Sequence, residues 1–307
     1  MHIARRHLHS SRPLHSSAAA AVLAAALLAT ATGCSSGSGD GGSKPLEALR
    51  HLPADANAAK QVTYADNVRI RKLSAADPER FKTVAQSASP LLNSYTVGPW
   101  GLILKESRID TTVDSAAAGH WDGSFDAAAV TASLKKSGYT SAEQDGGQVW
   151  KPADSGPALA VSDDEIRYAT DAAHFSATDP GHGASLADKQ EYRLVTGCLG
   201  DVYRADFNTL STTEPVRLSA LGQQADDSGR NTEVLCVAVK DQATADRLAA
   251  ELRSVVKDRA PRFDGTTVTV TKGDRPVVRA AVPDTAAQRP GRLFLTDYQL
   301  WMAVGKV

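Results

Sequence analysis

The chain has 307 residues, a formal net charge of −1 at pH 7, and 42% hydrophobic but only 6% aromatic residues. Residues 1–33 hold three arginines and no acidic residue, so the remainder carries a net charge of about −4. Such a surface lacks the density of Lys and Arg that neutralises phosphates, which excludes a nucleic-acid-binding protein. A remainder of roughly 270 residues can bury a sizeable core, so we expect it to fold without a metal.

The first 33 residues combine a basic start with a short apolar run. Arg5, Arg6 and Arg12 precede an uninterrupted run of Ala, Val and Leu over residues 18–29. A run of this length is too short to cross a hydrocarbon core of about 30 Å as a helix, but it matches the central part of an export signal. We therefore predict that the chain leaves the cytoplasm. Arg5-Arg6 resembles a twin-arginine signal only in part, which leaves the export route open.

Residues 31–34, with the sequence Ala-Thr-Gly-Cys, resemble the lipobox of bacterial lipoproteins, although Ala31 stands where leucine is commoner. The resemblance implies that residues 1–33 are a lipoprotein signal peptide. It also implies that Cys34 carries lipid acyl chains such as palmitate, and that these anchor the protein to the extracytoplasmic face of the cell membrane. An ordinary cleaved signal peptide or an uncleaved anchor is the alternative.

The segment of residues 34–44 is rich in Gly and Ser and cannot bury apolar area, so we interpret it as a flexible tether. Ten such residues have a mean end-to-end distance of roughly 17 Å, enough to hold a domain away from lipid headgroups. The leader, the lipobox and the tether together resemble actinobacterial surface lipoproteins. The rest of the chain carries no residues whose function this resemblance would assign.

Residues 45–197 contain the first predicted unit. Asp77 and Asp126 are typical helix N-caps, and Val130 and Leu134 share one face of the helix that follows Asp126. The expected elements, in chain order, are a helical turn over 46–52, a strand over 61–64, a helix from 78, a strand over 109–113, a helix from 127, strands over 148–151, 159–162 and 166–169, a loop over 172–184, and a helix over 185–195.

Residues 198–307 contain the second predicted unit, with strands over 217–221, 233–239, 267–271 and 277–282. Its best-formed element is a helix over 241–256, because Asp241 is a good N-cap and the apolar residues fall on one stripe. We therefore predict an α+β fold in which each unit is an antiparallel sheet with packed helices.

The two units also contain segments that align without gaps, Leu159–Ala169 and Leu293–Ala303. Each can be interpreted as an apolar strand, a polar turn and a returning strand, which predicts two related half-domains from an internal repeat. The repeat predicts that Leu293, Leu295, Leu300 and Met302 all point into the core. The alternative is chance similarity, since apolar strands on either side of a polar turn are common.

Two cysteines, Cys198 and Cys236, remain once Cys34 is assigned to lipid. Disulfides persist in exported proteins, so we predict that these two are bridged. The bridge would close a loop of about 38 residues, which would stabilise the fold by about 3 to 4 kcal/mol in the chain-entropy model. The alternative is two separately buried thiols, because Cys236 lies within the apolar run of residues 234–239.

The sequence contains no zinc-binding, calcium-binding or nucleotide-binding motif, so we predict no metal and no cofactor. His120 is expected to pack within the fold beside Trp121. His174 and His182 share a glycine-rich loop that could bind a metal, but solvated loop histidines are the commoner case. A Ser-x-x-Lys pattern at Ser133 lacks the partner motifs of penicillin-binding enzymes.

Four tryptophans could form a platform for carbohydrate, but burial in the core is the favoured interpretation for Trp100, Trp121, Trp150 and Trp301. The predicted function is that of a non-catalytic, envelope-associated protein that binds an unknown protein or small molecule. The alternative is a cell-envelope hydrolase with no motif in the sequence. A polar pocket containing a Ser, His or Asp with a shifted pKa would favour the hydrolase.

Overall fold

The computed structural model describes residues 43–54, 60–85, 89–92, 98–144, 147–178, 180–181, 183–209 and 215–307. These residues belong to one compact unit, Gly42–Val307. The predicted signal peptide, Cys34 and the tether up to residue 42 lie outside the described residues. Within the described part of the chain, no helix is both long and apolar enough to cross a bilayer.

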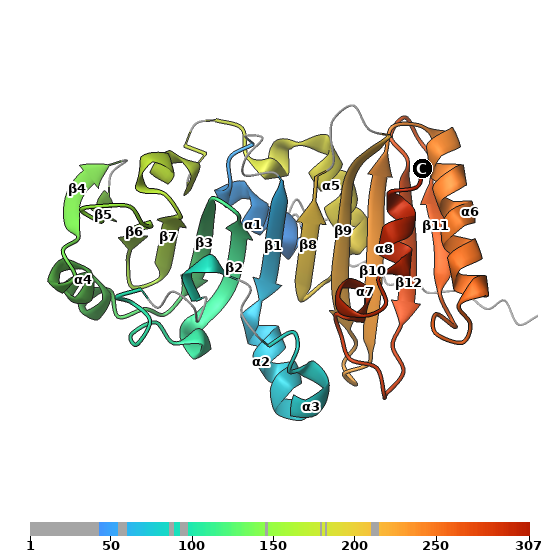
Figure 1. Ribbon diagram of the computed structural model, residues 1–307, viewed down its shortest axis with the longest axis horizontal. Helices are drawn as coiled ribbons and strands as arrows, with labels where there is room; N and C mark the ends of the chain where they lie inside the picture. The colour runs from blue at the N-terminus through green and yellow to red at the C-terminus, as the bar shows by residue number, and fades with distance from the viewer. Residues whose placement is uncertain are drawn as a thin grey trace, which may run out of the picture. The chain divides into compact units, whose positions relative to one another are not determined.

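The described strands form one antiparallel sheet in the order β11-β12-β10-β9-β8-β1-β2-β3-β7-β6-β5-β4 (Figure 1). The strands are β1 (Gln61–Asp66), β2 (Ile109–Ser115), β3 (Ala118–Gly123), β4 (Thr140–Gln144), β5 (Gly147–Lys151), β6 (Ala158–Val161), β7 (Glu165–Ala169), β8 (Arg204–Asn208), β9 (Val216–Ala225), β10 (Asn231–Val239), β11 (Thr267–Thr271) and β12 (Val277–Pro283).

Helices lie between and after these strands. The α-helices are α1 (Lys44–Ala48), α2 (Asn67–Ala76), α3 (Pro78–Phe81), α4 (Ala127–Lys136), α5 (Gln190–Leu199), α6 (Gln242–Asp258), α7 (Arg292–Leu295) and α8 (Gln299–Val304). Short 3-10 turns are η1 (Leu49–His51), η2 (Pro90–Leu92), η3 (Glu106–Arg108), η4 (Ala172–Thr178) and η5 (Leu186–Asp188).

Both faces of the sheet are covered, which explains why β10 is an almost continuous apolar run. Alternate side chains of a strand point to opposite faces. Val234 and Cys236 pack in the cluster that contains α5, whereas Leu235 and Val237 pack in the cluster that contains α6 and α8. The sheet has two arms, one on each side of β1: the first arm is β2–β7 and the second is β8–β12. In the first arm, α4 covers Trp121 and Leu159, and η4 packs on the opposite face.

The N-caps predicted from sequence are confirmed. The Asp126 carboxylate accepts a hydrogen bond from the Ala129 N–H at the start of α4, and Asp241 accepts one from Thr244 at the start of α6. Most predicted strands are also present. The sequence patterns do not predict β4, β8 or the helix α2 that directly follows β1.

The predicted hairpin over Leu293–Ala303 is wrong, because these residues form α7 and α8. Leu293 and Leu300 are fully buried, but Leu295 and Met302 are each 57% exposed. The spacing of the buried residues follows the helical period, so the alternation required by a strand does not hold. The alignment with Leu159–Ala169, which does form β6 and β7, therefore does not relate two equivalent hairpins.

The division into units of 45–197 and 198–307 also needs correction. Residue 198 lies inside α5, and the sheet is continuous because β1 pairs with both β2 and β8. The two arms do share one pairing pattern. In each arm a hairpin (β2–β3 or β9–β10) is followed by a helix and then by a meander, which has four strands (β4–β7) in one arm and two (β11–β12) in the other. The last strand of the meander returns to the hairpin, since β7 pairs with β3 as β12 pairs with β10.

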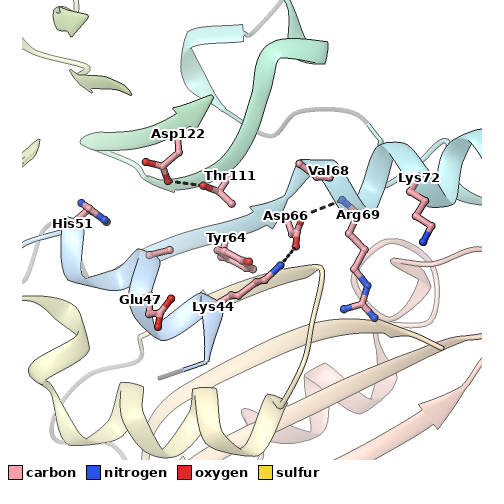
Figure 2. A pocket seen from close by; sticks show the side chains of 11 residues that line it. Lys44, Glu47, His51, Tyr64, Asp66, Val68, Arg69, Lys72, Thr111 and Asp122 are labelled. Carbon is pink, nitrogen blue, oxygen red and sulfur yellow. Dashed lines mark hydrogen bonds and ion pairs between the residues drawn. The ribbon is translucent and has the colours of Figure 1, made fainter. Parts of the chain in front are cut away.

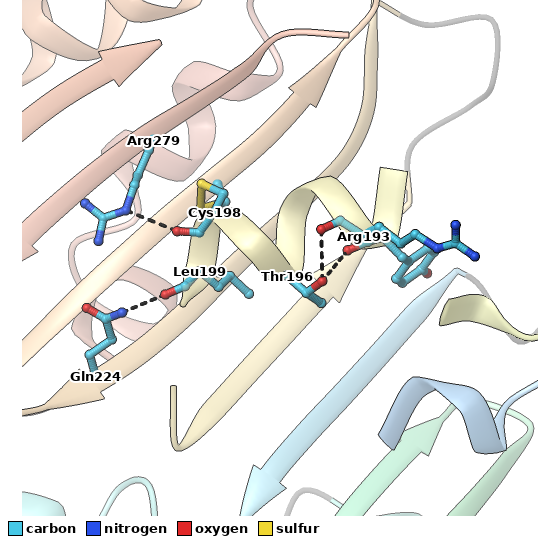
Figure 3. Close-up of a disulfide and its surroundings, with 8 residues drawn as sticks. Arg193, Thr196, Cys198, Leu199, Gln224 and Arg279 are labelled. Carbon is cyan, nitrogen blue, oxygen red and sulfur yellow. Dashed lines mark hydrogen bonds between the residues drawn. A yellow bond between two sulfur atoms is a disulfide. The ribbon is translucent and has the colours of Figure 1, made fainter. Parts of the chain in front are cut away.

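The predicted disulfide is confirmed. Cys198 of α5 is bonded to Cys236 of β10, with 6.1 Å between their Cα atoms (Figure 3). The last carbonyls of α5 are satisfied by side chains from the sheet: Arg279 Nε donates to the Cys198 carbonyl and Gln224 Nε2 to the Leu199 carbonyl. The bridge and these bonds fasten the end of α5 to the neighbouring strands β9, β10 and β12.

Candidate functional site

A cavity of about 600 Å³ lies where α1, β1 and α2 meet the β2–β3 hairpin (Figure 2). Its volume is within the usual range for small-molecule sites. Eleven residues line it: Lys44, Glu47, Ala48, His51, Tyr64, Asp66, Val68, Arg69, Lys72, Thr111 and Asp122.

The polar floor of the cavity follows from the strand register. Asp66 ends β1 and lies opposite Thr111 of β2, which in turn lies opposite Asp122 of β3. Residues paired in this way project from the same face of the sheet. Tyr64 is two residues before Asp66 and shares its face, so one face of three strands supplies the polar groups.

Asp66 bonds to both helices that form the walls of the cavity, α1 and α2. Its Oδ1 accepts a hydrogen bond from the Arg69 N–H, at 2.9 Å, and so caps the start of α2. Its Oδ2 accepts one from Lys44 Nζ of α1, at 2.8 Å. Asp66 is buried, and these two bonds compensate the loss of water around its carboxylate.

Tyr64 is fully buried, and its hydroxyl has no hydrogen-bond partner among the described residues. Burial, and next the negative charge of Asp66, hold the pKa of the Tyr64 phenol well above its usual value. The hydroxyl therefore remains protonated and can donate one hydrogen bond. Leaving a buried polar group unpaired costs about 1 to 3 kcal/mol. Several buried side-chain atoms in the described part of the chain lack a partner, and among the residues that line the cavity this is true of Tyr64 alone.

The charged residues of the cavity fall into two groups. Lys44 is paired with Asp66, and Arg69 Nη1 lies 2.8 Å from Asp201 Oδ2. In contrast, Glu47 of α1 and Lys72 of α2 are exposed and form no ion pair with any residue that the structure describes. Figure 2 shows them on opposite sides of Tyr64.

At the far edge, His51 stacks on His120 with 3.7 Å between ring centroids. His120 Nε2 lies 3.2 Å from Asp122 Oδ1, and its Nδ1 lies 3.2 Å from Glu165 Oε1 in a geometry outside that of a hydrogen bond. Asp122 also accepts a hydrogen bond from Thr111. The bond with His120 is the main reason why the pKa of Asp122 lies below its usual value, with Thr111 adding to it against the effect of burial.

Asp122 gives the cavity a carboxylate with a shifted pKa, the kind of group that would favour a hydrolase, but the shift is downward. An acid catalyst needs a raised pKa, whereas that of Asp122 is lowered. The Thr111 hydroxyl donates to a carboxylate, and the residues lining the cavity include no serine or cysteine.

The structure places the sequence-predicted candidates away from this cavity, apart from His120, which is buried in β3 behind His51. His174 lies 3.3 Å from Asp171, His182 is outside the described residues, and no group of residues suited to a metal is found in the described ranges. Buried positions are occupied by Trp100, Trp121 and Trp150, and Trp301 is half-buried against the α6 cluster, as the core interpretation predicts.

Sequence reasoning missed Tyr64, Asp66 and Arg69. The available signal was the Asp66-Asn67 pair, a possible N-cap directly after a strand. The sequence pattern predicts a strand that ends at Tyr64, and it therefore predicts neither this cap nor α2.

No family model and no curated protein matches this chain. Solved structures of TP0453 are similar at low level. Its crystal form I has 10% identity and a TM-score of 0.42, and the match covers 76% of this chain and 92% of that one. Crystal form IV has 8% identity and a TM-score of 0.39, covering 84% and 95%. At such scores, the function must be inferred from this chain's own residues.

Proposed function

We propose that this chain is a lipid-anchored, extracytoplasmic protein that binds a small ligand in the Tyr64 cavity without transforming it. The anchor is inferred from the lipobox-like segment that ends at Cys34. The binding function rests on one observation, the buried and unpaired hydroxyl of Tyr64 in the wall of a cavity of about 600 Å³.

The unpaired hydroxyl supports binding because it lowers stability. A hydrophobic side chain of the same size, such as Phe, would fill the position without a buried polar atom. A ligand with an acceptor atom would satisfy the hydroxyl and recover the 1 to 3 kcal/mol or so that it costs. Function is a common reason for a fold to retain such a group.

Thermal unfolding in the presence of a chemically diverse set of small molecules tests the binding function. A ligand at 100 times its Kd stabilises the folded state by about 2.7 kcal/mol, which raises the unfolding midpoint by several degrees. Ala48→Trp fills the cavity and should abolish this rise. The matched control is Ala250→Trp on the exposed side of α6, which should leave it unchanged.

Tyr64→Phe provides a second measurement. The variant should be more stable than the wild type by about 1 to 3 kcal/mol without ligand and should gain less from it. If no compound in the set raises the midpoint of the wild type, or if every rise survives Ala48→Trp, the cavity is not a binding site.

A further inference from the structure

We infer that the ligand of the Tyr64 cavity is a short peptide with a free ammonium group and a free carboxylate. This inference rests on the proposed binding function and adds the chemical class of the ligand. It is carried by three groups that line the cavity and have no partner among the described residues: Glu47, Tyr64 and Lys72.

The other charges of the cavity are already compensated. Asp66 bonds Lys44 and the start of α2, Arg69 pairs with Asp201, and Asp122 accepts from Thr111 and His120. A ligand that displaced Lys44 would remove one partner of the buried Asp66 carboxylate, which is costly. Recognition of a charged ligand therefore falls to the groups that are not already paired.

The two uncompensated charges have opposite sign and belong to different walls. Glu47 is on α1 and attracts a cation, whereas Lys72 is on α2 and attracts an anion. In Figure 2 they lie on opposite sides of the Tyr64 ring. A ligand with a single charge would satisfy one wall only, whereas a dipolar ligand matches both.

The Tyr64 hydroxyl indicates which kind of group the middle of the ligand should carry. Its hydroxyl is a donor, because the phenol is held in its neutral form. A donor between a cation-binding and an anion-binding wall matches an acceptor between the two charged ends of the ligand. A peptide carbonyl is such an acceptor, and a dipeptide or tripeptide places it between the ammonium group and the carboxylate.

Calorimetric titration of the full, processed protein in detergent micelles tests the inference with three probes. Alanyl-alanine carries both charges, its N-acetyl form lacks the ammonium group, and its C-terminal amide lacks the carboxylate. We expect each blocked form to bind at least tenfold more weakly than alanyl-alanine. Tyr64→Phe should weaken all three without changing their order.

Variants that each remove one charge test which residue binds the ammonium group of the ligand and which binds its carboxylate. Glu47→Gln should abolish the preference for alanyl-alanine over its N-acetyl form, and Lys72→Met the preference over the amide. Glu143→Gln in β4 and Lys136→Met in α4 remove exposed charges elsewhere and should change neither preference.

The outcomes distinguish a failure of the peptide assignment from a failure of the proposed binding function on which it rests. Equal binding of all three probes, or preferences that survive both charge-removing variants, would overturn the peptide assignment. If no probe binds but other compounds raise the midpoint in a manner sensitive to Ala48→Trp, the peptide class is wrong and the binding function stands. If nothing binds in either experiment, both fail.

Discussion

At the scale of single residues, the fold treats its buried polar groups in two ways. Asp114 is buried on β2, and its Oδ1 accepts hydrogen bonds from Trp121 Nε1, the Tyr168 hydroxyl and Ser89 Oγ at 2.8, 2.6 and 3.3 Å. Tyr64 has no such compensation. Full hydrogen bonding, as at Asp114, is what a stable core requires. An unpaired hydroxyl, as at Tyr64, is what we expect of a binding site without its ligand.

Asp114 predicts a measurable pH dependence. Burial raises the pKa of its carboxyl to about 6, against the opposing effect of the three hydrogen bonds. Because an exposed Asp titrates near pH 4, the folded chain binds more protons than the unfolded chain between about pH 4 and 6. The contribution of Asp114 to stability therefore falls as the pH rises through this window, by on the order of 2 to 3 kcal/mol.

Urea unfolding of Asp114→Asn at several pH values checks this prediction. The amide keeps an oxygen acceptor but cannot ionise in this range, so the free energy of unfolding should vary less with pH than in the wild type. Asp227→Asn, at an exposed turn, is the matched control. The same slope in wild type and Asp114→Asn would rule out this role for Asp114.

At the scale of elements, the short helices α7 and α8 owe their place to contacts with distant strands. The buried Glu233 of β10 accepts hydrogen bonds from the N–H groups of Arg292 and Leu293 at the start of α7. The Arg292 side chain pairs with Asp284 and Asp297. These bonds satisfy a helix start that carries no side-chain cap of its own.

A pair of leucine substitutions tests the helical assignment of this segment. Leu300→Ala removes a fully buried side chain and should lower the free energy of unfolding by about 2 to 5 kcal/mol. Leu295→Ala removes a side chain that is 57% exposed and should change it by no more than about 0.5 kcal/mol. Equal losses in chemical denaturation would instead favour the strand pattern.

The disulfide joins α5 to β10, and both its presence and its contribution to stability can be measured. In the Cys34→Ala background, the unreduced, denatured chain should show no free thiol, and reduction should release two. Loss of the bridge in Cys198→Ser/Cys236→Ser should lower the free energy of unfolding by about 3 to 4 kcal/mol relative to that background. Two thiols before reduction would contradict the bridge.

At the scale of the whole molecule, β1 lies between the two arms of the sheet, because it pairs with β2 on one side and β8 on the other. The cavity therefore contains groups from the first helix, the central strand and the first arm. This arrangement places the proposed site near the start of the folded chain, only ten residues after Cys34 at Lys44.

The lipid anchor gives the last prediction. One acyl chain binds a membrane only marginally, whereas the two or three chains of a bacterial lipoprotein anchor it stably. Cys34→Ala should therefore release the protein from the membrane fraction or leave its precursor unprocessed. Ser38→Ala in the tether should behave as the wild type in the same fractionation. A processed Cys34→Ala protein that remained with the membrane would show that acylation is not the anchor.

Much of the local structure could be predicted from sequence because the signals are local. An N-cap such as Asp126 or Asp241 acts on the next turn of its own helix, and apolar stripes with a period of 2 or 3.6 specify which face is buried. The disulfide could be predicted because only two cysteines remained for it. The α+β class, the strands around Cys236 and the helix α6 follow from such patterns.

Tertiary structure decided the rest. Residues 293–303 form helices rather than a hairpin because Glu233 and the core beneath α8 select one set of buried side chains from a pattern compatible with both. The cavity brings together Lys44, Asp66 and Asp122, which are far apart in the sequence and meet only through the pairing of β1, β2 and β3. Strand order and register depend on contacts between distant segments, and no local period encodes them.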